Sequence, residues 1–371
     1  MSEEKINIHF YQGKNNKVNK EYQLIDILYE IEIFFCKNIE KAENLCFLIG
    51  SGCSTPAIPL MGTTFYDIKN FITLFHSDKV LGDFKESKDI EKYLNWLNKA
   101  IDFLKNEEND DYKKVRNYTQ SQLIQSIDID YSDKKALETL EIYKKFYNTI
   151  FKIRKKSKNP INIFTTNYDL FNEKALENLK INYCNGFNGF IERIFEPSIF
   201  KQRIVDEENR YKEKWNPLKK YVRLYKIHGS IDWIEKDNKI QQVQEYSGKE
   251  NILIYPTQAK HFETQYSPYS ELFREMNIKL QSQNTTLIVL GYGFSDDHIN
   301  NLIAQSLINE DFNLIILNSY EENNNFTKAG EFFNKYNDKM NIHFIGGKNE
   351  EGKSLHYFDT FLSILSGGVI D

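Results

Sequence analysis

The feature that most limits the fold of this chain is the regular alternation of helical and strand patterns in its C-terminal third. From residue 269 onward, amphipathic helical patterns and short apolar runs typical of buried strands follow one another. Helices are expected near 269–283, 296–309, 323–337 and 354–366, and strands at 285–290, 312–318 and 341–345. Such alternation is typical of an α/β fold with a parallel, doubly wound, Rossmann-like sheet. Ligands of these sheets bind beyond the carboxyl ends of the strands, so the residues that follow the strands are the first candidates for a functional site.

The earlier part of the chain is expected to supply further strands of the same sheet. An amphipathic helix at 21–44 leads into an apolar strand at 45–49, and further strands are expected at 161–165, 181–184, 222–227 and 251–256. Residues 63–158 carry helical patterns and no convincing strand, which predicts a helical insertion or subdomain. Residues 185–220 look irregular and aromatic, as in a lid. We therefore expect a single domain over residues 1–371, with core segments at 45–62, 160–184 and 221–346.

Charge and cysteine usage exclude several classes of protein. A formal net charge of -5 gives no electrostatic reason to bind nucleic acid, which is expected only indirectly, through a partner. The four cysteines include no C-x-x-C pair, so no zinc ribbon is encoded and no metal site is expected. The first 20 residues have no apolar signal core, and no apolar run approaches the roughly 20 residues of a membrane span. A cytoplasmic protein is expected.

A glycine loop follows the strand at 45–49. In Gly50-Ser51-Gly52 the two glycines would let backbone N–H groups approach a pyrophosphate closely. The usual dinucleotide fingerprint needs a third glycine where this chain has Thr55, and there is no Gly-Lys-Ser/Thr of a P-loop. Pro56 and Pro59 prevent a regular helix from starting directly after the glycines, which predicts an extended loop. The segment alone fits a nucleotide loop and an ordinary strand-to-loop turn equally well.

Polar or glycine-containing clusters follow four other strands. They are Thr166-Asn167-Tyr168-Asp169, His228-Gly229-Ser230, the segment 291–295 (GYGFS) and Asn318-Ser319. Each falls at a carboxyl end, so all are expected to face one crevice. Each also has a structural explanation, since Asn167 or Asp169 can cap the next helix, His228 can be a hydrogen-bonded turn residue, and Ser295 or Asp296 can cap the helix at 296–309.

Taken in order, these motifs resemble those of the sirtuin family. GSGCSTPAIP (50–59) is similar to the cofactor loop, and TTNYD (165–169) to the family's Thr-Gln-Asn-Ile-Asp. KIHGSIDW (226–233) resembles its His-Gly element, GYGFSDDHI (291–299) its Gly-x-Ser loop, and ILN (316–318) the strand end that holds the adenosine ribose. The resemblance implies a sirtuin-type fold whose substrate is NAD.

Two departures from the family pattern argue against protein deacylation. Deacylase sirtuins carry aspartate-phenylalanine-arginine after the proline, where this chain has Leu60-Met61-Gly62. The zinc module with its four cysteines is absent. The chain looks closer to the bacterial sirtuin-like proteins of anti-phage defence, which destroy NAD.

The resemblance also assigns roles to individual residues. Asn167 would orient the nicotinamide ribose and an attacking water, and His228 would be the general base. Asp169 would bind the nicotinamide carboxamide, and Thr166 in the same loop would also contact the cofactor. The remaining cofactor-binding residues are Gly50, Ser51, Gly52 and Ser54 on the pyrophosphate and its flanking ribose, Gly291, Gly293 and Ser295 on the diphosphate–adenosine side, and Asn318 on the adenosine ribose.

The leading functional hypothesis is a NAD glycohydrolase that gives nicotinamide and ADP-ribose and depletes NAD during phage infection. Cleavage of the nicotinamide–ribose bond passes through an oxocarbenium-like state, and the departing pyridine needs no general acid. An asparagine and a histidine supply positioning and a base for water. The resemblance further implies self-assembly into oligomers or a separately encoded partner such as a HerA-type ATPase. The alternatives are a deacylase or ADP-ribosyltransferase of the same fold and a non-catalytic sensor of ADP-ribose derivatives.

Overall fold

The main element of the fold is a nine-stranded sheet. The computed structural model describes residues 8–18, 23–75, 78–104, 110–157, 159–244, 251–253, 267–349 and 351–367. The strands of this sheet lie in the order β2-β1-β18-β15-β14-β3-β4-β10-β5. Their bounds are β1 (Ile8–Gln12), β2 (Asn15–Asn16), β3 (Asn44–Ile49), β4 (Ile161–Thr165), β5 (Asn182–Cys184), β10 (Tyr221–Lys226), β14 (Thr285–Leu290), β15 (Asn313–Leu317) and β18 (Ile342–Gly347).

The strand order confirms the predicted doubly wound topology. From β3 the chain builds outward through β4 and β10, then returns to place β14, β15 and β18 on the other side, with every one of these pairings parallel. The order reverses between β3 and β14, which is where such sheets bind their ligands. The N-terminal strand β1 was not predicted. It pairs antiparallel with β18, so the sheet is mixed at that edge.

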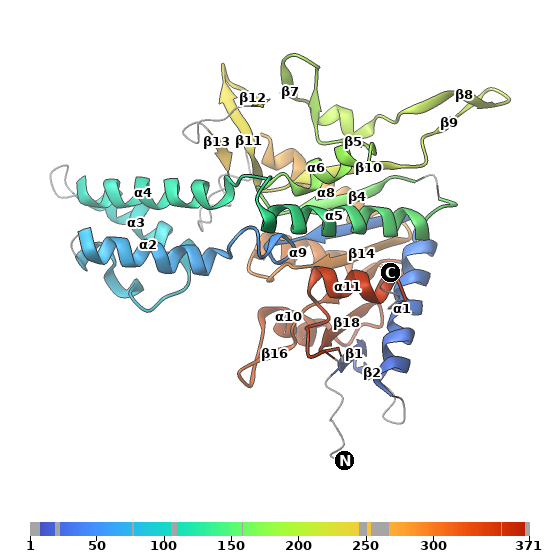
Figure 1. The fold of residues 1–371 in the computed structure, drawn as a ribbon, viewed down its shortest axis with the longest axis horizontal. Coiled ribbons are helices and arrows are strands. Elements are labelled where there is room, and N and C mark those ends of the chain that lie inside the picture. The colour runs from blue at the N-terminus through green and yellow to red at the C-terminus, as the bar shows by residue number, and fades with distance from the viewer. Residues whose placement is uncertain are drawn as a thin grey trace.

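Helices cover both faces of the sheet, as Figure 1 shows. On β3, Leu45, Phe47 and Ile49 contribute to one apolar cluster and Cys46 and Leu48 to the other, because successive side chains of a strand point to opposite faces. The first face is covered by α1 (Leu24–Lys41), α5 (Lys134–Ile153), α6 (Phe171–Asn178) and α11 (Phe358–Leu365). The second is covered by α8 (Tyr269–Leu280), α9 (Asp297–Ser306) and α10 (Lys328–Tyr336).

Three helices of the expected insertion form an arm that projects from the body (Figure 1). The helical arm consists of α2 (Met61–Phe75), α3 (Ile90–Phe103) and α4 (Asp110–Ile127), and it has an apolar cluster of its own. Helix α5 lies within the expected insertion too, but its side chains pack in the main core. At the base of the arm, Ile124 and Ile127 of α4 pack against Tyr168 and Ile231 of the body. None of the helices that the structure describes is long and apolar enough to cross a membrane.

The expectation of an irregular lid at 185–220 is wrong. Short strands there join others into a second sheet of order β13-β11-β12-β7-β6, and a separate hairpin follows. The bounds are β6 (Phe187–Asn188), β7 (Arg193–Phe195), β11 (Gly229–Lys236), β12 (Lys239–Gln242) and β13 (Asn251–Leu253), with the hairpin formed by β8 (Val205–Tyr211) and β9 (Lys214–Pro217). Strands of two or three residues, such as β6 and β7, are too short to show an alternating apolar and polar pattern, and pairing with distant strands determines their conformation. Of the strand expected at 251–256, residues 254–256 lie outside the described residues.

Two expected boundaries are also wrong. The strand expected at 222–227 ends at Lys226 as β10, and a further strand that was not expected, β11, starts at Gly229. The helix expected at 323–337 starts only at Lys328, after a hairpin of β16 (Glu321–Glu322) and β17 (Asn325–Phe326). The two residues at the tip of that hairpin, Asn323 and Asn324, have φ values of 51° and 63°, a conformation that asparagine tolerates better than most residues.

The loops after β3 and β14 pack tightly at the point where the strand order reverses. Gly50 N–H donates to the Leu290 carbonyl at 2.9 Å, and Gly52 N–H donates to the Gly291 carbonyl at 3.0 Å. A Cβ atom on Gly50 would lie 2.4 Å from the Gly291 oxygen. The loop after β3 is therefore not simply extended: it forms a 3-10 turn at Ser51–Ser54, held against its neighbour by glycine backbone.

We predict that Gly291→Ala destabilises the protein and Gly293→Ala does not. Gly291 has a φ of +62°, and its Cβ would lie 2.6 Å from the Cys53 nitrogen, whereas a Cβ on Gly293 meets nothing closer than 3.8 Å. We expect Gly291→Ala to lower the free energy of unfolding by about 1–3 kcal/mol, the range for a strained backbone position. Chemical denaturation of both variants is the measurement, and equal stabilities would contradict this account of the loop contact.

Candidate active site

A cavity of about 500 Å³ lies between the carboxyl ends of the central strands and the base of the helical arm. This volume is within the usual range for small-molecule sites. Of the residues predicted to form the site, the walls include Ser51, Ser54, Thr166, Asn167, Asp169, His228, Gly293 and Ser295. Four segments far apart in the sequence therefore meet at one cavity.

Four of the predicted residues do not line this cavity in the described structure: Gly50, Gly52, Gly291 and Asn318. The N–H groups of Gly50 and Gly52 are bonded to carbonyls of the neighbouring loop, so they are not aimed at a ligand here. Asn318 donates from Nδ2 to the Tyr292 carbonyl at 2.8 Å and thereby supports the loop after β14. Contact of these four with a ligand stays a prediction, while their observed contacts shape the site.

The side-chain amide of Asn167 is fixed by two hydrogen bonds. Its Nδ2 donates to the Gly50 carbonyl at 3.1 Å and to the Ser54 hydroxyl oxygen at 3.0 Å, which uses both amide hydrogens. Because a carbonyl can only accept, the bond to Gly50 identifies the nitrogen and so settles the orientation of the amide. Asn167 is 5% exposed, and its Oδ1 accepts no hydrogen bond from any residue that the structure describes.

Ser54 connects Asn167 to Asp169. The fully buried Ser54 hydroxyl donates to Asp169 Oδ2 at 2.8 Å, and its oxygen lies 3.0 Å from the Tyr143 hydroxyl. A serine has one hydrogen to donate, so Tyr143 donates to Ser54. Burial raises the pKa of Asp169, an effect that nearby Lys226 partly offsets. Ser54, predicted as a ligand contact, is also the residue that holds the amide and the carboxylate in place.

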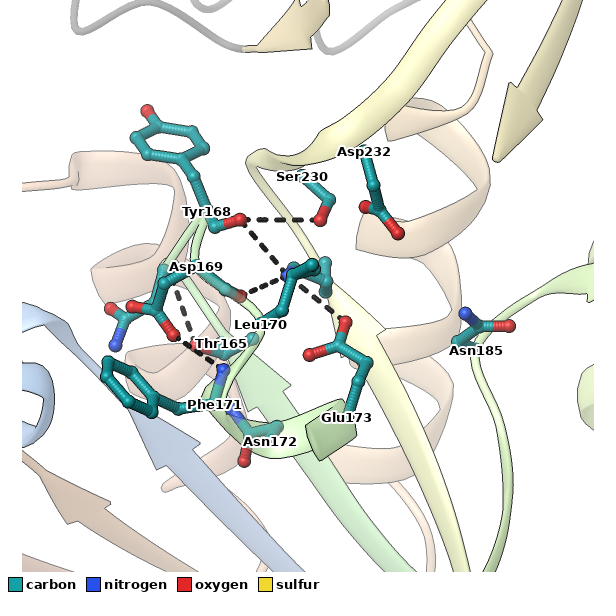
Figure 2. A network of polar contacts seen from close by, with 12 residues as sticks. Thr165, Tyr168, Asp169, Leu170, Phe171, Asn172, Glu173, Asn185, Ser230 and Asp232 are labelled. Atoms are coloured by element: carbon teal, nitrogen blue, oxygen red, sulfur yellow. Dashed lines mark hydrogen bonds and ion pairs between the residues drawn. The ribbon is translucent and has the colours of Figure 1, made fainter. Parts of the chain in front are cut away.

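A buried ion pair not anticipated from the sequence supports the loop that carries these groups (Figure 2). Lys226 Nζ lies 3.1 Å from Glu173 Oε1 and donates to the carbonyl oxygens of Tyr168 and Asp169. Ser230 donates to the same Tyr168 carbonyl at 3.3 Å. Burial raises the pKa of Glu173 to about 7, although Lys226 acts in the opposite direction. The buried Lys226–Glu173 pair thus holds the loop after β4 in position through the backbone carbonyls of that loop.

His228 forms a close pair with Asp296, at the start of α9. The distance from His228 Nε2 to Asp296 Oδ2 is 3.1 Å, and both residues are buried. The carboxylate also caps α9, as expected for Ser295 or Asp296, because Oδ1 accepts from the His298 N–H at 2.9 Å. The sequence analysis assigned Asp296 no place in the site. Its position directly after the predicted Gly-x-Ser loop was the available signal.

The helical arm and the loop that leads into it from β3 supply the apolar wall of the cavity, which the sequence analysis did not foresee. Its members are Ile58, Pro59, Leu60, Met61, Ile90, Leu123 and Ile127. Lys88 and Lys328 also line the cavity as exposed cations, and Asp89 adds a half-buried carboxylate. Lys328 Nζ lies 3.3 Å from the Ser295 hydroxyl. The cavity therefore combines an apolar side, a buried polar side and positive charge on its exposed lining.

A metal centre is not seen in the described ranges. These residues contain no group of three or more histidines, cysteines, aspartates or glutamates placed to hold a metal ion. The four cysteines are free, and burial raises the pKa of the Cys53 thiol well above its ordinary value. Cys53 packs in the glycine loop as a small apolar side chain.

The model of one protein family matches part of this chain. Residues 161–345 match the family model of the SIR2-like domain, a range from β4 to β18 that includes Asn167, His228 and Asp296 but not the glycine loop after β3. No curated protein matches the chain. Among solved structures, Sir2Tm bound to a propionylated peptide aligns with 11% identity and a TM-score of 0.34, over 82% of this chain and 95% of that one.

The strand order, the reversal between β3 and β14 and the match over 161–345 lead to one assignment. A SIR2-like domain indicates a NAD-related function. The chain carries a SIR2-like domain, and its fold is a sirtuin-like, Rossmann-type α/β fold.

Proposed function

We propose that this protein is a NAD glycohydrolase that releases nicotinamide and ADP-ribose. The observation that carries the proposal is the amide of Asn167, whose Oδ1 is left without a partner among the described residues while His228 lines the same cavity. A buried carbonyl oxygen without a donor is costly, commonly about 1–3 kcal/mol, unless a ligand or water supplies the hydrogen bond. A ribose hydroxyl and an attacking water are both donors of the required kind.

The chemistry of the reaction matches what these groups can do. When the nicotinamide–ribose bond breaks, the pyridinium becomes neutral nicotinamide and positive charge develops on the ribose, as in glycoside hydrolysis. The leaving group needs no proton. The site must instead hold the ribose, place a water beside its anomeric carbon and remove a proton from that water.

The division of labour follows from the hydrogen-bond inventory of each side chain. Asn167, with both N–H groups used internally, acts as an acceptor that orients the ribose hydroxyl or the water. His228 accepts the proton of the water, since an imidazole titrates near neutral pH. Asp169 keeps lone pairs on both carboxylate oxygens besides those used by Ser54 and the Phe171 N–H, so it can accept from the carboxamide of nicotinamide.

The apolar wall supports hydrolysis over protein deacylation. Leu60 and Met61 stand at the sequence position where deacylase sirtuins have charged and aromatic residues, and both line the cavity. The wall provides an apolar surface for a planar ring of NAD. It lacks the arginine that deacylase sirtuins have at this position.

The first test is NAD hydrolysis by the purified protein. We expect Asn167→Ala and His228→Ala each to lower nicotinamide release by about 10²-fold or more, since positioned proton transfer typically contributes about 10²–10⁴-fold. Matched controls are Asn178→Ala, an exposed asparagine of α6, and His9→Ala, on the N-terminal strand β1. Both control variants should keep the wild-type rate.

Four results would each redirect the proposal. Intact NAD under every activating condition tried, or normal hydrolysis by both active-site variants, would reject the glycohydrolase. Nicotinamide release that requires an acylated peptide would favour the deacylase or transferase alternative. Tight binding of ADP-ribose without turnover would favour a sensor.

Lys328 is the cation we assign to the diphosphate of NAD. It is the first residue of α10, where the helix N-terminus adds positive potential, and it lies beside Ser295 on the cavity wall. The sequence analysis assigned Ser295 to the diphosphate–adenosine side of NAD, and Lys328 lies within hydrogen-bond distance of that residue. Lys328 is exposed, so solvent screens its charge and its contribution is modest.

We predict that Lys328→Ala raises the KM for NAD by about 3–10-fold and leaves kcat within about 2-fold, because the charge aids binding in both the ground state and the transition state. Lys335→Ala, an exposed lysine at the other end of α10, is the matched control and should change neither parameter. The difference between the two variants should shrink at high salt. A purely kcat effect of Lys328→Ala would contradict the assignment to the diphosphate.

The biological setting we propose is anti-phage defence, with NAD depletion as the toxic output. The support for it is the resemblance to bacterial sirtuin-like defence proteins. Such an enzyme must be restrained until infection, and we propose that this occurs through self-assembly or a HerA-type ATPase partner encoded nearby. Native mass measurement, alone and with the neighbouring gene product, is expected to give an assembly larger than one chain. A monomer in both samples would count against it.

A further inference from the structure

We propose that Asp296 is the positioning residue of the site: its carboxylate fixes the imidazole of His228 and stabilises that ring when it takes up a proton. This inference rests on the proposed hydrolysis of NAD for its catalytic meaning. The pairing itself is independent of the reaction and is tested separately below.

The two oxygens of Asp296 have different partners. Oδ1 accepts from the backbone N–H groups of His298 at 2.9 Å and Ile299 at 3.4 Å, which caps α9. Oδ2 lies 3.1 Å from His228 Nε2. A helix cap needs one side-chain oxygen, so capping alone leaves the second contact unexplained.

The backbone of Asp296 is held by the loop after β14. Its N–H donates to the Tyr292 hydroxyl at 3.3 Å, and that hydroxyl lies 3.2 Å from the Asp296 carbonyl and 3.1 Å from Asn300 Oδ1. The Tyr292 carbonyl in turn accepts from Asn318. The Asp296 carboxylate is therefore held in place at the carboxyl end of β14. It can set the orientation of the His228 ring, which lies just after β10.

The contact determines which nitrogen of His228 is basic. A neutral imidazole has one N–H and one lone pair, and a carboxylate can only accept, so Nε2 carries the hydrogen and Nδ1 the lone pair. In hydrolysis the water oxygen bonds to the anomeric carbon as the carbon–nitrogen bond breaks, and that bond's electron pair stays on nicotinamide. The proton of the water passes to Nδ1. The resulting imidazolium lies beside the Asp296 carboxylate, which stabilises it, and later loses the proton to solvent.

Other charged or titratable groups lie near His228 as well. The Tyr168 ring lies 6.5 Å from the imidazole, centroid to centroid. Those that share its cavity are Lys88, Asp89, Asp169, Tyr292 and Lys328. The Asp296 carboxylate lies within hydrogen-bond distance of the His228 ring, at 3.1 Å from Nε2.

The decisive variant is Asp296→Asn, because asparagine caps a helix about as well as aspartate but carries no charge. Asp297→Asn is the matched control: it removes the same charge one residue later, from an exposed side chain that does not line the cavity. Asp296→Ser is a second variant that keeps a capping oxygen and is too short to reach His228. Thermal melting of all three verifies that α9 stays folded.

The pairing is tested without substrate by NMR titration of the imidazole signals, with His228→Gln identifying the His228 resonance. We expect the titration midpoint of His228 to fall by about one pH unit in Asp296→Asn, because an adjacent carboxylate favours the protonated ring. Asp297→Asn should leave it within a few tenths of a unit. An unchanged midpoint in Asp296→Asn and Asp296→Ser would overturn the proposal, whatever the enzyme does to NAD.

The catalytic consequence is read from the pH dependence of kcat/KM for NAD. In Asp296→Asn we expect the rise of the rate with pH to move about one unit lower, with a plateau about 10–100-fold below the wild type. A folded Asp296→Asn with the wild-type profile and plateau would overturn the proposal, as would an equal shift in Asp297→Asn. A wild type that leaves NAD intact while the NMR shift occurs would reject the glycohydrolase and leave the positioning role standing.

Discussion

The site depends on the pair of hydrogen bonds that the Asn167 amide donates to the Gly50 carbonyl and the Ser54 hydroxyl. They join the loop after β3 to the loop after β4. The two loops are therefore not independent, and together they fix the position of one amide. They also use every N–H of the side chain, which leaves Oδ1 as its remaining hydrogen-bonding atom. The same Ser54 hydroxyl then donates to Asp169, and thus a single buried serine fixes both polar side chains of the β4 loop.

The support beneath this loop has an energetic cost. Burying the charged groups of Lys226 and Glu173 away from water is unfavourable, and a well-packed apolar pair of similar volume is often as stable or more so. What the lysine does here is geometric, because its donors bind the backbone carbonyls of Tyr168 and Asp169, the two residues that follow Asn167. A buried ion pair retained at that position is best explained by the need to hold the loop in one place.

The sequence predicts the features that follow from local pattern. Apolar runs such as 285–290 and 312–318 are long enough to identify buried strands, and polar residues directly after a parallel strand must lie at the same sheet edge. For that reason Asn167 and His228, 61 positions apart in the printed sequence, were correctly predicted to share a cavity. Such reasoning could not predict the two-residue strand β6, the N-terminal strand β1 or the Lys226–Glu173 pair, because partners distant in sequence determine them. Asp296 is intermediate: its capping role is local and was predicted, whereas its contact with His228 requires the fold.

The helical arm shows how a segment outside the sheet becomes part of the chemistry. Its apolar side chains form one wall of the cavity, and its base packs through Ile124 and Ile127 on Tyr168, the residue next to Asn167. The backbone carbonyl of Tyr168 is at the same time bound by Lys226 and Ser230. The side chain of Tyr168 therefore packs against the helical arm, while its carbonyl belongs to the buried polar network. Tyr168 thus links the position of the arm to the position of the Asn167 amide. The shape of the apolar wall and the orientation of the polar groups opposite it are consequently not independent features of this site.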